Sequence, residues 1–197
     1  TNCNLVYLSS MEHIGDMHYE KSGMHNGELP DIDSWLKETL FDDSRRYNFI
    51  KDKITNKNIL DFGCGIGGFL DCAKKSAATA SGVELDLSLQ ESFENRDLKV
   101  FPNLLSAQKG KTKYDLITSF HVIEHLSNPI SILKELAELL DENGEIIIEV
   151  PNSDDVLLTL YNCKSFQNFT YWSQHLFLFN SHTLARLIKQ AGLKLTW

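Results

Sequence analysis

The feature that most constrains the fold is a glycine-rich stretch at residues 58–70, Asn-Ile-Leu-Asp-Phe-Gly-Cys-Gly-Ile-Gly-Gly-Phe-Leu. Its apolar start favours a strand that ends at Asp61-Phe62. The glycines at positions 63, 65, 67 and 68 permit the positive φ angles of a tight turn. Leu70 then begins the apolar stripe of a helix. A strand, a turn and a helix in this order place a small ligand at the carboxyl edge of a parallel sheet.

A carboxylate follows this turn at a meaningful distance. Residues 74–80 are predicted to close the first helix, and residues 81–86, Ser-Gly-Val-Glu-Leu-Asp, to form a second strand that ends in acids. Glu84 lies about 20 residues beyond the first glycine, where a carboxylate accepts hydrogen bonds from ribose hydroxyls. A nicotinamide dinucleotide site usually reads G-x-G-x-x-G, a spacing that the glycines at 63, 65 and 68 also have, so the residues beside the glycines must distinguish the two kinds of site. Asp61, just before the first glycine, would repel a pyrophosphate and suits a cationic amino-acid head.

With these residues in view, the chain resembles the class I S-adenosylmethionine-dependent methyltransferases. The match begins near residue 45 and runs to the C-terminus, with the motifs in the family's order and spacing. It is closest to the group that includes ubiquinone-biosynthesis O-methyltransferases and bacterial small-molecule and sugar methyltransferases. The segments that carry the resemblance are the glycine turn at residues 61–67, the second strand at 82–86, the fourth strand and its loop at 114–126, and the fifth strand at 144–152.

The resemblance implies S-adenosylmethionine as the cofactor and a set of residues around it. Family members often have Asp-Leu near the adenine after the third strand, where this chain has Asn103-Leu104. Arg46 is either a partner of the donor carboxylate or part of a solvated helix face, and the second interpretation is preferred. The residues expected to bind the donor are Asp61, Gly63, Cys64, Gly65, Gly67, Glu84, Leu85, Asn103, Leu104, Phe120 and His121.

Residues 121–125, His-Val-Ile-Glu-His, spell a pattern that zinc peptidases also use. That chemistry needs both histidines on one long helix, but the pattern follows a predicted strand, and Asn128-Pro129 signals a new helix start. Some similar enzymes, including small-RNA 2′-O-methyltransferases, bind a metal through E-x-x-E-H and a later histidine, a role that His175 could fill. The preferred interpretation is that no metal binds and that Glu124 and His125 orient the loop.

Methylation of a hydroxyl is assisted by a general base, and histidine is the common choice near neutral pH. We therefore expect His121, Glu124, His125 and His175 to serve the acceptor side as the candidate catalytic residues. For His175 the alternative is a hydrogen-bonded structural histidine before Leu-Phe-Leu-Phe.

The expected fold is α/β, a Rossmann-like doubly wound, mostly parallel sheet with helices on both faces. Residues 1–30 are predicted to form an arm or lid, and residues 31–197 the S-adenosylmethionine-binding domain, with an acceptor-pocket insertion at 151–180. A helix is expected over 32–54, a short third strand at Val100-Phe101, and a helix capped by Ser181. Residues 193–197 could form a sixth strand but nothing follows them, so the C-terminal edge is incomplete or completed differently.

The composition limits the class of partner. The 197 residues carry 27 acidic and 19 basic side chains, a net charge of −8 that disfavours binding to a phosphate backbone. No apolar run of transmembrane length and no signal peptide are found, although a start at Thr1 suggests that the natural start is missing. The four cysteines lack paired spacing and are expected to be free thiols in the cytoplasm.

The sequence thus predicts an enzyme that transfers a methyl group from S-adenosylmethionine to a hydroxyl of a small molecule, with a sugar or nucleotide-sugar preferred. The alternatives are a donor-binding module or scaffold subunit without catalysis, and a metal-assisted 2′-O-methyltransferase acting on RNA. The oligomeric state is not predicted.

Overall fold

The fold was analysed in a computed structural model, which describes residues 4–14, 18–21 and 31–196. The strands are β1 (Val6–Tyr7), β2 (Asn58–Phe62), β3 (Thr79–Val83), β4 (Lys99–Phe101), β5 (Tyr114–Phe120), β6 (Leu140–Glu149) and β7 (Phe177–Leu178). The helices are α1 (Ile32–Ile54), α2 (Gly68–Ala73), α3 (Gln90–Asn95), α4 (Leu104–Lys109), α5 (Pro129–Leu139), α6 (Val156–Thr159), α7 (Lys164–Thr170) and α8 (Ser181–Gln190), with 3₁₀ turns η2 (Leu87–Leu89) and η3 (Ile123–His125).

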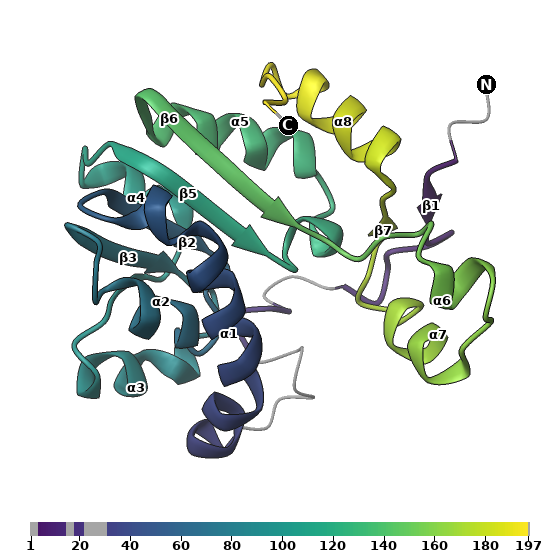
Figure 1. Cartoon of the computed structure of the whole chain (residues 1–197), viewed down its shortest axis with the longest axis horizontal. Coiled ribbons are helices and arrows are strands. Elements are labelled where there is room, and N and C mark those ends of the chain that lie inside the picture. The colour runs from purple at the N-terminus through teal and green to yellow at the C-terminus, as the bar shows by residue number, and fades with distance from the viewer. Residues whose placement is uncertain (1–3, 15–17, 22–30, 197) are drawn as a thin grey trace. The chain divides into compact units, whose positions relative to one another are not determined.

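A five-stranded sheet with the order β4-β3-β2-β5-β6 forms the centre of the fold, and Figure 1 shows β3, β2, β5 and β6 side by side. The pairs β2–β3, β2–β5 and β3–β4 run parallel. The order reverses at β2, because the chain crosses from β4 back to β5 on the other side of it. A mostly parallel sheet with helices around it confirms the predicted α/β, Rossmann-like fold, and the reversal marks where such sheets bind ligands.

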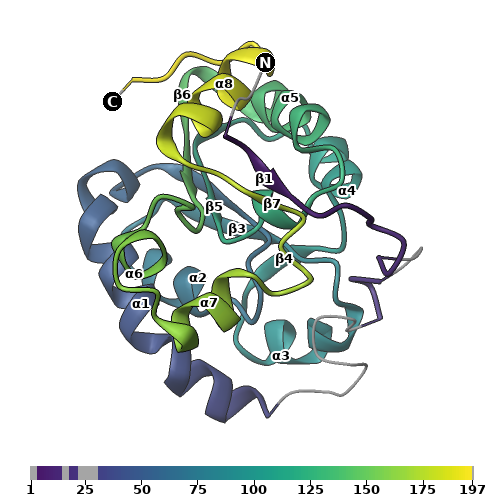
Figure 2. The same cartoon turned by 90° about the vertical axis from the view of Figure 1, so that its right-hand side faces the viewer.

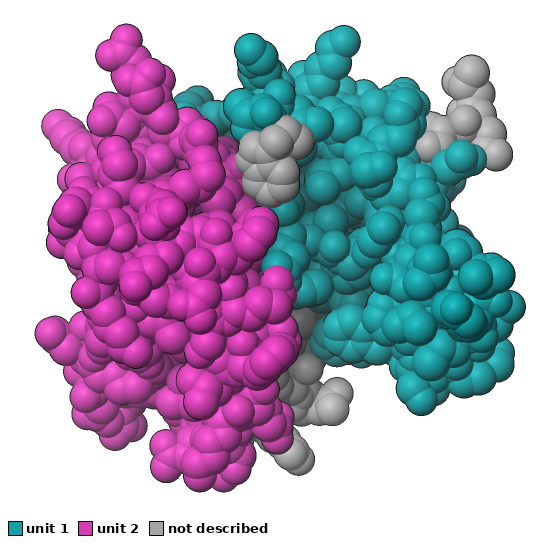
Figure 3. Space-filling model, viewed as in Figure 1, with its two compact units in different colours: residues 1–15, 121–138, 148–197 teal, residues 16–120, 139–147 magenta. Residues whose placement is uncertain are grey.

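Two compact units are recognised by their internal contacts and are coloured separately in Figure 3. One unit comprises residues 16–120 and 139–147, and the other residues 1–15, 121–138 and 148–197. Unit 2 of Figure 3, residues 16–120 and 139–147, contains most of the sheet, and unit 1 contains the small β1–β7 pair.

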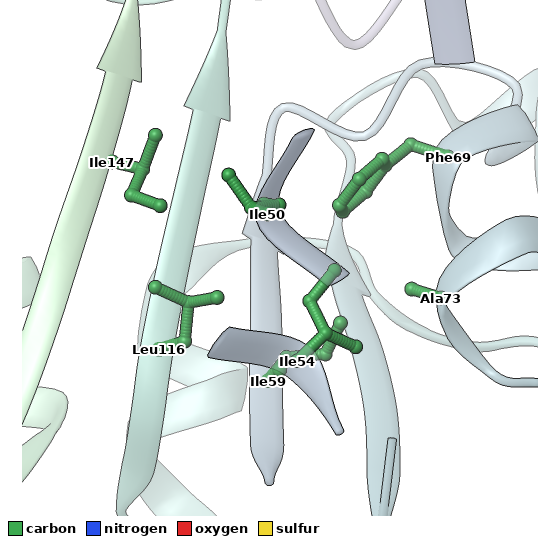
Figure 4. Packing of buried hydrophobic residues seen from close by; sticks show 7 residues of the cluster. All are labelled: Ile50, Ile54, Ile59, Phe69, Ala73, Leu116 and Ile147. Carbon is green, nitrogen blue, oxygen red and sulfur yellow. The ribbon is translucent and has the colours of Figure 1, made fainter. Parts of the chain in front are cut away.

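The core of the sheet-containing unit forms where α1 and α2 lie against the sheet. Ile50 and Ile54 of α1 pack with Phe69 and Ala73 of α2 on apolar side chains of β2, β5 and β6 (Figure 4). Ile54 is fully buried. β2 precedes the glycine turn and α2 follows it, so this packing holds both ends of the turn in place.

Gly82 in β3 allows the turn to approach the sheet closely. A Cβ atom there would lie 2.6 Å from the Cys64 Sγ and 2.8 Å from the Leu70 Cδ1, both closer than van der Waals contact allows. The absence of a side chain at this position is therefore what lets the turn and α2 rest on β3.

The structure confirms several predicted elements, among them the helix α1 over 32–54, the short strand β4 at 99–101 and the start of α5 at Pro129. At the start of α5, the Asn128 side chain accepts a hydrogen bond from the Ser131 N–H. The helix after the glycine turn, α2, ends at Ala73, and Thr79-Ala80 already belong to β3. The prediction that residues 74–80 close this helix is therefore wrong. β3 pairs with β2 from its first residue, Thr79, so the start of β3 is determined by this long-range pairing.

The cap of α8 is Asn180 rather than Ser181. The Asn180 side chain accepts from the Thr183 N–H, and the Thr183 hydroxyl is in turn bonded to the Asn180 N–H, which makes a reciprocal capping box. Residues 193–196 form no strand, so the sixth strand considered there is not found among the described residues.

The segment 151–180 folds into α6, α7 and β7, and β7 pairs antiparallel with β1, as Figure 2 shows. Residues 1–3, 15–17 and 22–30 of the predicted arm lie outside the described residues, and its function as a lid stays a prediction. Across the described chain, none of the helices combines the length and apolar character that crossing a bilayer requires. Cys64, Cys72 and Cys163 are free thiols, and the cytoplasmic location stays a prediction.

Candidate functional site

The glycine turn between β2 and α2 exposes its backbone. Gly63, Gly65 and Gly67 all have positive φ angles, of 74°, 51° and 78°. The N–H groups of Gly63 and Cys64 donate to the Val83 carbonyl, at 2.9 and 3.1 Å, and fix the turn on the end of β3. A Cβ atom at Gly65 would meet no atom of the described residues within 4 Å. The turn therefore presents open backbone at Gly65, where a ligand can approach closely.

Glu84 at the end of β3 holds this turn. Its Oε2 accepts a hydrogen bond from the Gly65 N–H at 2.8 Å, and its Oε1 accepts from the Asp86 N–H at 3.0 Å. Burial raises the pKa of the Glu84 carboxyl, although both backbone hydrogen bonds act in the opposite direction. Carboxylate oxygens have lone pairs left after these two bonds, so Glu84 can accept a further hydrogen bond from a ligand hydroxyl.

Asp61 is a buried acid directly before the turn. It is 2% exposed, and its Oδ1 accepts a hydrogen bond from the Thr118 hydroxyl at 2.7 Å. Burial, with a smaller contribution from the nearby Asp43 carboxylate, raises the pKa of Asp61 to about 7. Because Thr118 faces Asp61 across the β2–β5 register, the pairing of strands distant in sequence creates this environment.

Arg46 of α1 is packed rather than solvated. Its guanidinium lies 3.7 Å from the Asp43 carboxylate and 5.0 Å from the centre of the Phe120 ring. Phe120 also makes an edge contact with Phe69, with ring centres 4.9 Å apart. The preference for a solvated face at Arg46 is therefore wrong, because the last residue of β5 provides an aromatic surface for it.

Arg96, after α3, was not identified from the sequence. Its Nη1 lies 2.6 Å from the Asp71 Oδ2, and its Nη2 donates to the Ile66 carbonyl within the glycine turn. The turn is thus held by Glu84 through an N–H and by Arg96 through a carbonyl. The residues joined here are 25 to 30 positions apart, and no local pattern marks such a contact.

The other predicted donor residues have local structural roles as well. Asn103 caps α4, because its Oδ1 accepts from the N–H and the hydroxyl of Ser106 at 2.9 and 2.8 Å. Leu104 is buried and Leu85 is half-buried. Cys64 is buried, and burial raises the pKa of its thiol well above the usual value. Its Sγ lies 3.8 Å from the Gly65 carbonyl oxygen.

His121 directly follows β5 and takes a strained conformation, with a φ of +57°. Its N–H donates to the Glu149 carbonyl at 2.8 Å. The ring lies between two carboxylates, with Nδ1 3.3 Å from the Glu124 Oε1 and Nε2 3.2 Å from the Glu149 Oε1.

Glu124, His125 and His175 form a buried cluster in unit 1. Each offers one oxygen or nitrogen atom, and the three atoms lie within 4.8 Å of one another. The His125 Nδ1 donates to the Gln174 carbonyl and the His175 Nδ1 to the Thr170 carbonyl, both at 2.8 Å. Burial lowers the pKa of His125, although the Glu124 carboxylate acts in the opposite direction. These hydrogen bonds place the proton of each neutral ring on Nδ1 and the lone pair on Nε2.

The cluster does not have the architecture of a zinc peptidase. Glu124 and His125 lie in the short 3₁₀ turn η3, so the two histidines of the 121–125 pattern are not on a long helix. Of the four predicted acceptor-side residues, three gather in this cluster, and the fourth, His121, contacts it through Glu124. The predicted donor residues from Asp61 to Phe120 belong to the other compact unit.

Comparisons with known proteins agree on one family. The family model described as "Methyltransferase domain" matches residues 32–196. The chain is similar to the ubiquinone biosynthesis O-methyltransferase of Hydrogenovibrio crunogenus, at 28% identity over 162 residues, which cover 75% of this chain and 67% of that protein.

Solved structures show the same fold. A SAM dependent methyltransferase from Archaeoglobus fulgidus has a TM-score of 0.63 and 23% identity, over 77% of this chain and 67% of that one. Magnesium protoporphyrin IX methyltransferase from Synechocystis PCC 6803, with bound SAH, has a TM-score of 0.59 and 15% identity, over 89% and 86% of the two chains.

The buried Asp61 generates a testable prediction on stability. Its pKa of about 7 in the folded protein exceeds the ordinary aspartate pKa of 3.8, so between these pH values the folded protein holds the proton more tightly than the unfolded one. The free energy of unfolding that Asp61 contributes is therefore present at pH 4 and lost as the pH rises to 7. The Asp61→Asn variant lacks this titrating group and should not lose this stability. From pH 4 to pH 7.5, we expect its free energy of unfolding to rise by roughly 2–4 kcal/mol relative to that of the unsubstituted protein.

Urea unfolding at both pH values measures this difference, with the exposed Asp52→Asn as the matched control. Equal pH dependence in Asp61→Asn and the unsubstituted protein would contradict the assignment of this pKa.

Proposed function

We propose that this chain, which belongs to the methyltransferase-domain family, methylates a hydroxyl of a small-molecule acceptor. Class I members of this family use S-adenosylmethionine as the methyl donor. It is a class I methyltransferase enzyme, and S-adenosylmethionine is its cofactor. The choice of oxygen as the acceptor atom is supported by the O-methyltransferases to which the chain is similar. The acceptor itself, its class and the roles of single residues belong to the proposal.

The donor is proposed to bind at the glycine turn. The open backbone at Gly65 supports this placement, and the remaining lone pairs of Glu84 suit the ribose hydroxyls. Asp61 is proposed to order the turn and to contact the donor amino group directly or through water. The cationic donor favours the ionised form of Asp61, which compensates for part of the cost of burying that charge.

In the reaction, the bond from sulfur to the methyl carbon breaks as the bond from the acceptor oxygen to that carbon forms. The sulfonium leaves as a neutral thioether, and the hydroxyl proton must go to a base. The protein mainly aligns the two reactants and excludes water, since the donor is already activated. We propose that His121, Glu124, His125 and His175 serve the acceptor side, because His121 follows the carboxyl end of β5 and the other three gather beside it.

The observation that supports the acceptor class is the aromatic surface of the 151–180 insertion. Four aromatic side chains around α6 and α7 remain exposed to solvent: Tyr161 at 69%, Phe169 at 55%, Tyr171 at 56% and Trp172 at 38%. Aromatic faces pack well on flat or sugar-like surfaces. A sugar or nucleotide-sugar is the proposed acceptor, and the net charge of −8 argues against RNA.

The experiment that tests this function is incubation of the chain with methyl-labelled S-adenosylmethionine and a cell-extract metabolite pool, followed by mass spectrometry. We expect label in a hydroxyl-bearing small molecule as a methyl ether. Label found only in RNA would contradict the acceptor class. Donor binding without any labelled product would favour a donor-binding module without catalysis.

Glu84→Ala is expected to weaken binding of S-adenosylhomocysteine by about 1.5–3 kcal/mol, or roughly 10- to 150-fold, because it removes a charged hydrogen-bond acceptor. Isothermal titration calorimetry measures the change, and circular dichroism verifies that the variant is folded. Glu91→Ala, an exposed acid of α3, is the matched control and should bind normally. If Glu84→Ala binds as tightly as the control, Glu84 does not hold the donor.

A further inference from the structure

The buried cluster of Glu124, His125 and His175 has the composition of a metal site. Two imidazoles and one carboxylate offer their atoms within 4.8 Å of one another, and all three residues are buried. We propose that this cluster binds one divalent transition-metal ion of the class that Zn²⁺ represents. This proposal replaces the sequence-based expectation that no metal binds.

The hydrogen bonds of the two histidines prepare them as ligands. Each Nδ1 donates to a backbone carbonyl, of Gln174 or Thr170, which leaves the Nε2 lone pair of the neutral ring for a metal. Metal-binding histidines are commonly oriented by such a bond from the other ring nitrogen. The cluster therefore brings together two imidazole rings and a carboxylate, the kinds of ligand that transition-metal ions take in proteins.

Glu124 supplies a second, independent observation. Its side chain is 0% exposed, and its Oε2 has no hydrogen-bond partner among the residues that the structure describes. Its Oε1 lies 3.3 Å from the His121 Nδ1. Burying an unsatisfied carboxylate oxygen is costly, and coordination to a metal ion would satisfy it. Each proposed ligand would then keep a hydrogen-bond partner beyond the metal: Gln174 for His125, Thr170 for His175 and His121 for Glu124.

A protonated histidine could supply the positive charge instead, but the geometry favours the metal. The His125 Nε2 is 4.0 Å from the Glu124 Oε1, well beyond the roughly 2.8 Å of a charge-assisted hydrogen bond.

The site requires only a small contraction. At a zinc–nitrogen distance of about 2.0–2.1 Å, tetrahedral ligand atoms lie about 3.4 Å apart, so atoms that now lie within 4.8 Å of one another would close by up to about 1.4 Å. Glu124 and His125 lie in η3, and His175 lies between α7 and β7. The Leu176 N–H donates to the Glu124 carbonyl at 2.8 Å and already joins the two segments. Two nitrogens and one carboxylate suit zinc, iron or manganese better than magnesium, and leave a coordination position open.

The proposal is argued from the ligand atoms alone and does not depend on the identity of the methyl acceptor. It does bear on the proposed reaction, because an Nε2 atom that binds the ion cannot also accept the hydroxyl proton. Metal binding and methyl transfer are therefore measured separately.

The test is calorimetric titration of ZnCl₂ into the full chain after EDTA treatment and dialysis. We expect one Zn²⁺ per chain with micromolar or tighter affinity, and a visible absorption spectrum when Co²⁺ is used in place of Zn²⁺. His175→Ala and Glu124→Gln should each weaken Zn²⁺ binding at least about tenfold. His182→Ala, an exposed histidine of α8, is the matched control and should bind Zn²⁺ normally.

Glu124→Gln keeps nearly the shape of the side chain, so it tests the site even if His175→Ala fails to fold. Binding of S-adenosylhomocysteine verifies that each variant retains its donor unit. The proposal is overturned if the unsubstituted chain binds no Zn²⁺, or if folded Glu124→Gln binds Zn²⁺ as tightly as His182→Ala. Since none of these readouts requires turnover, their failure leaves the proposed methyl transfer untouched.

Discussion

The hydrogen bond from the Gly65 N–H to the Glu84 carboxylate is the interaction on which the proposed donor site depends. It joins the turn after β2 to the end of β3, so the backbone that faces the ligand is fixed by the neighbouring strand. Arg96 holds the same turn from its other side through the Ile66 carbonyl. The parallel pairing of β2 and β3 brings these groups together, and the close approach at Gly82 lets the turn lie flat on the sheet. Because these contacts already order the turn, ligand binding does not carry the free-energy cost of ordering it.

Acidic groups dominate the electrostatics around this turn. Asp43, Asp61 and Glu84 lie near it, and burial raises the pKa of each of them. A donor that carries a sulfonium and an ammonium group would relieve the mutual repulsion of these acids. The same acids would repel a dinucleotide pyrophosphate, which is consistent with the family to which the chain belongs. The histidine cluster around Glu124 presents the same situation in the other unit, because a buried carboxylate there faces two nitrogen lone pairs.

The sequence predicted what local patterns control. The strand, turn and helix at 58–70, the long helix α1 and the start of α5 follow from hydrophobic periodicity, glycine and Asn-Pro signals, and the structure confirms them. The contacts that distant segments create could not be predicted. The β1–β7 pair, the packing of Arg46 on Phe120, and the bond from Arg96 to Ile66 each join positions far apart in the chain. For the histidines, the sequence singled out His125 and His175 as candidates, but only the fold shows that the two lie side by side with each Nδ1 on a carbonyl.

The open backbone at Gly65 is the proposed donor site, and calorimetric titration of S-adenosylhomocysteine into Gly65→Ala tests this placement most directly. Gly192→Ala is the matched control, because both glycines have positive φ angles, of 51° and 82°, and at both a Cβ atom would meet nothing within 4 Å in the part of the chain that the structure describes. The two variants should therefore lose similar, modest stability of about 1 kcal/mol from backbone strain. We predict that Gly65→Ala loses at least about tenfold in affinity, equivalent to about 1.4 kcal/mol, while Gly192→Ala binds normally. Equal affinity in the two folded variants would contradict the placement of the donor at the glycine turn.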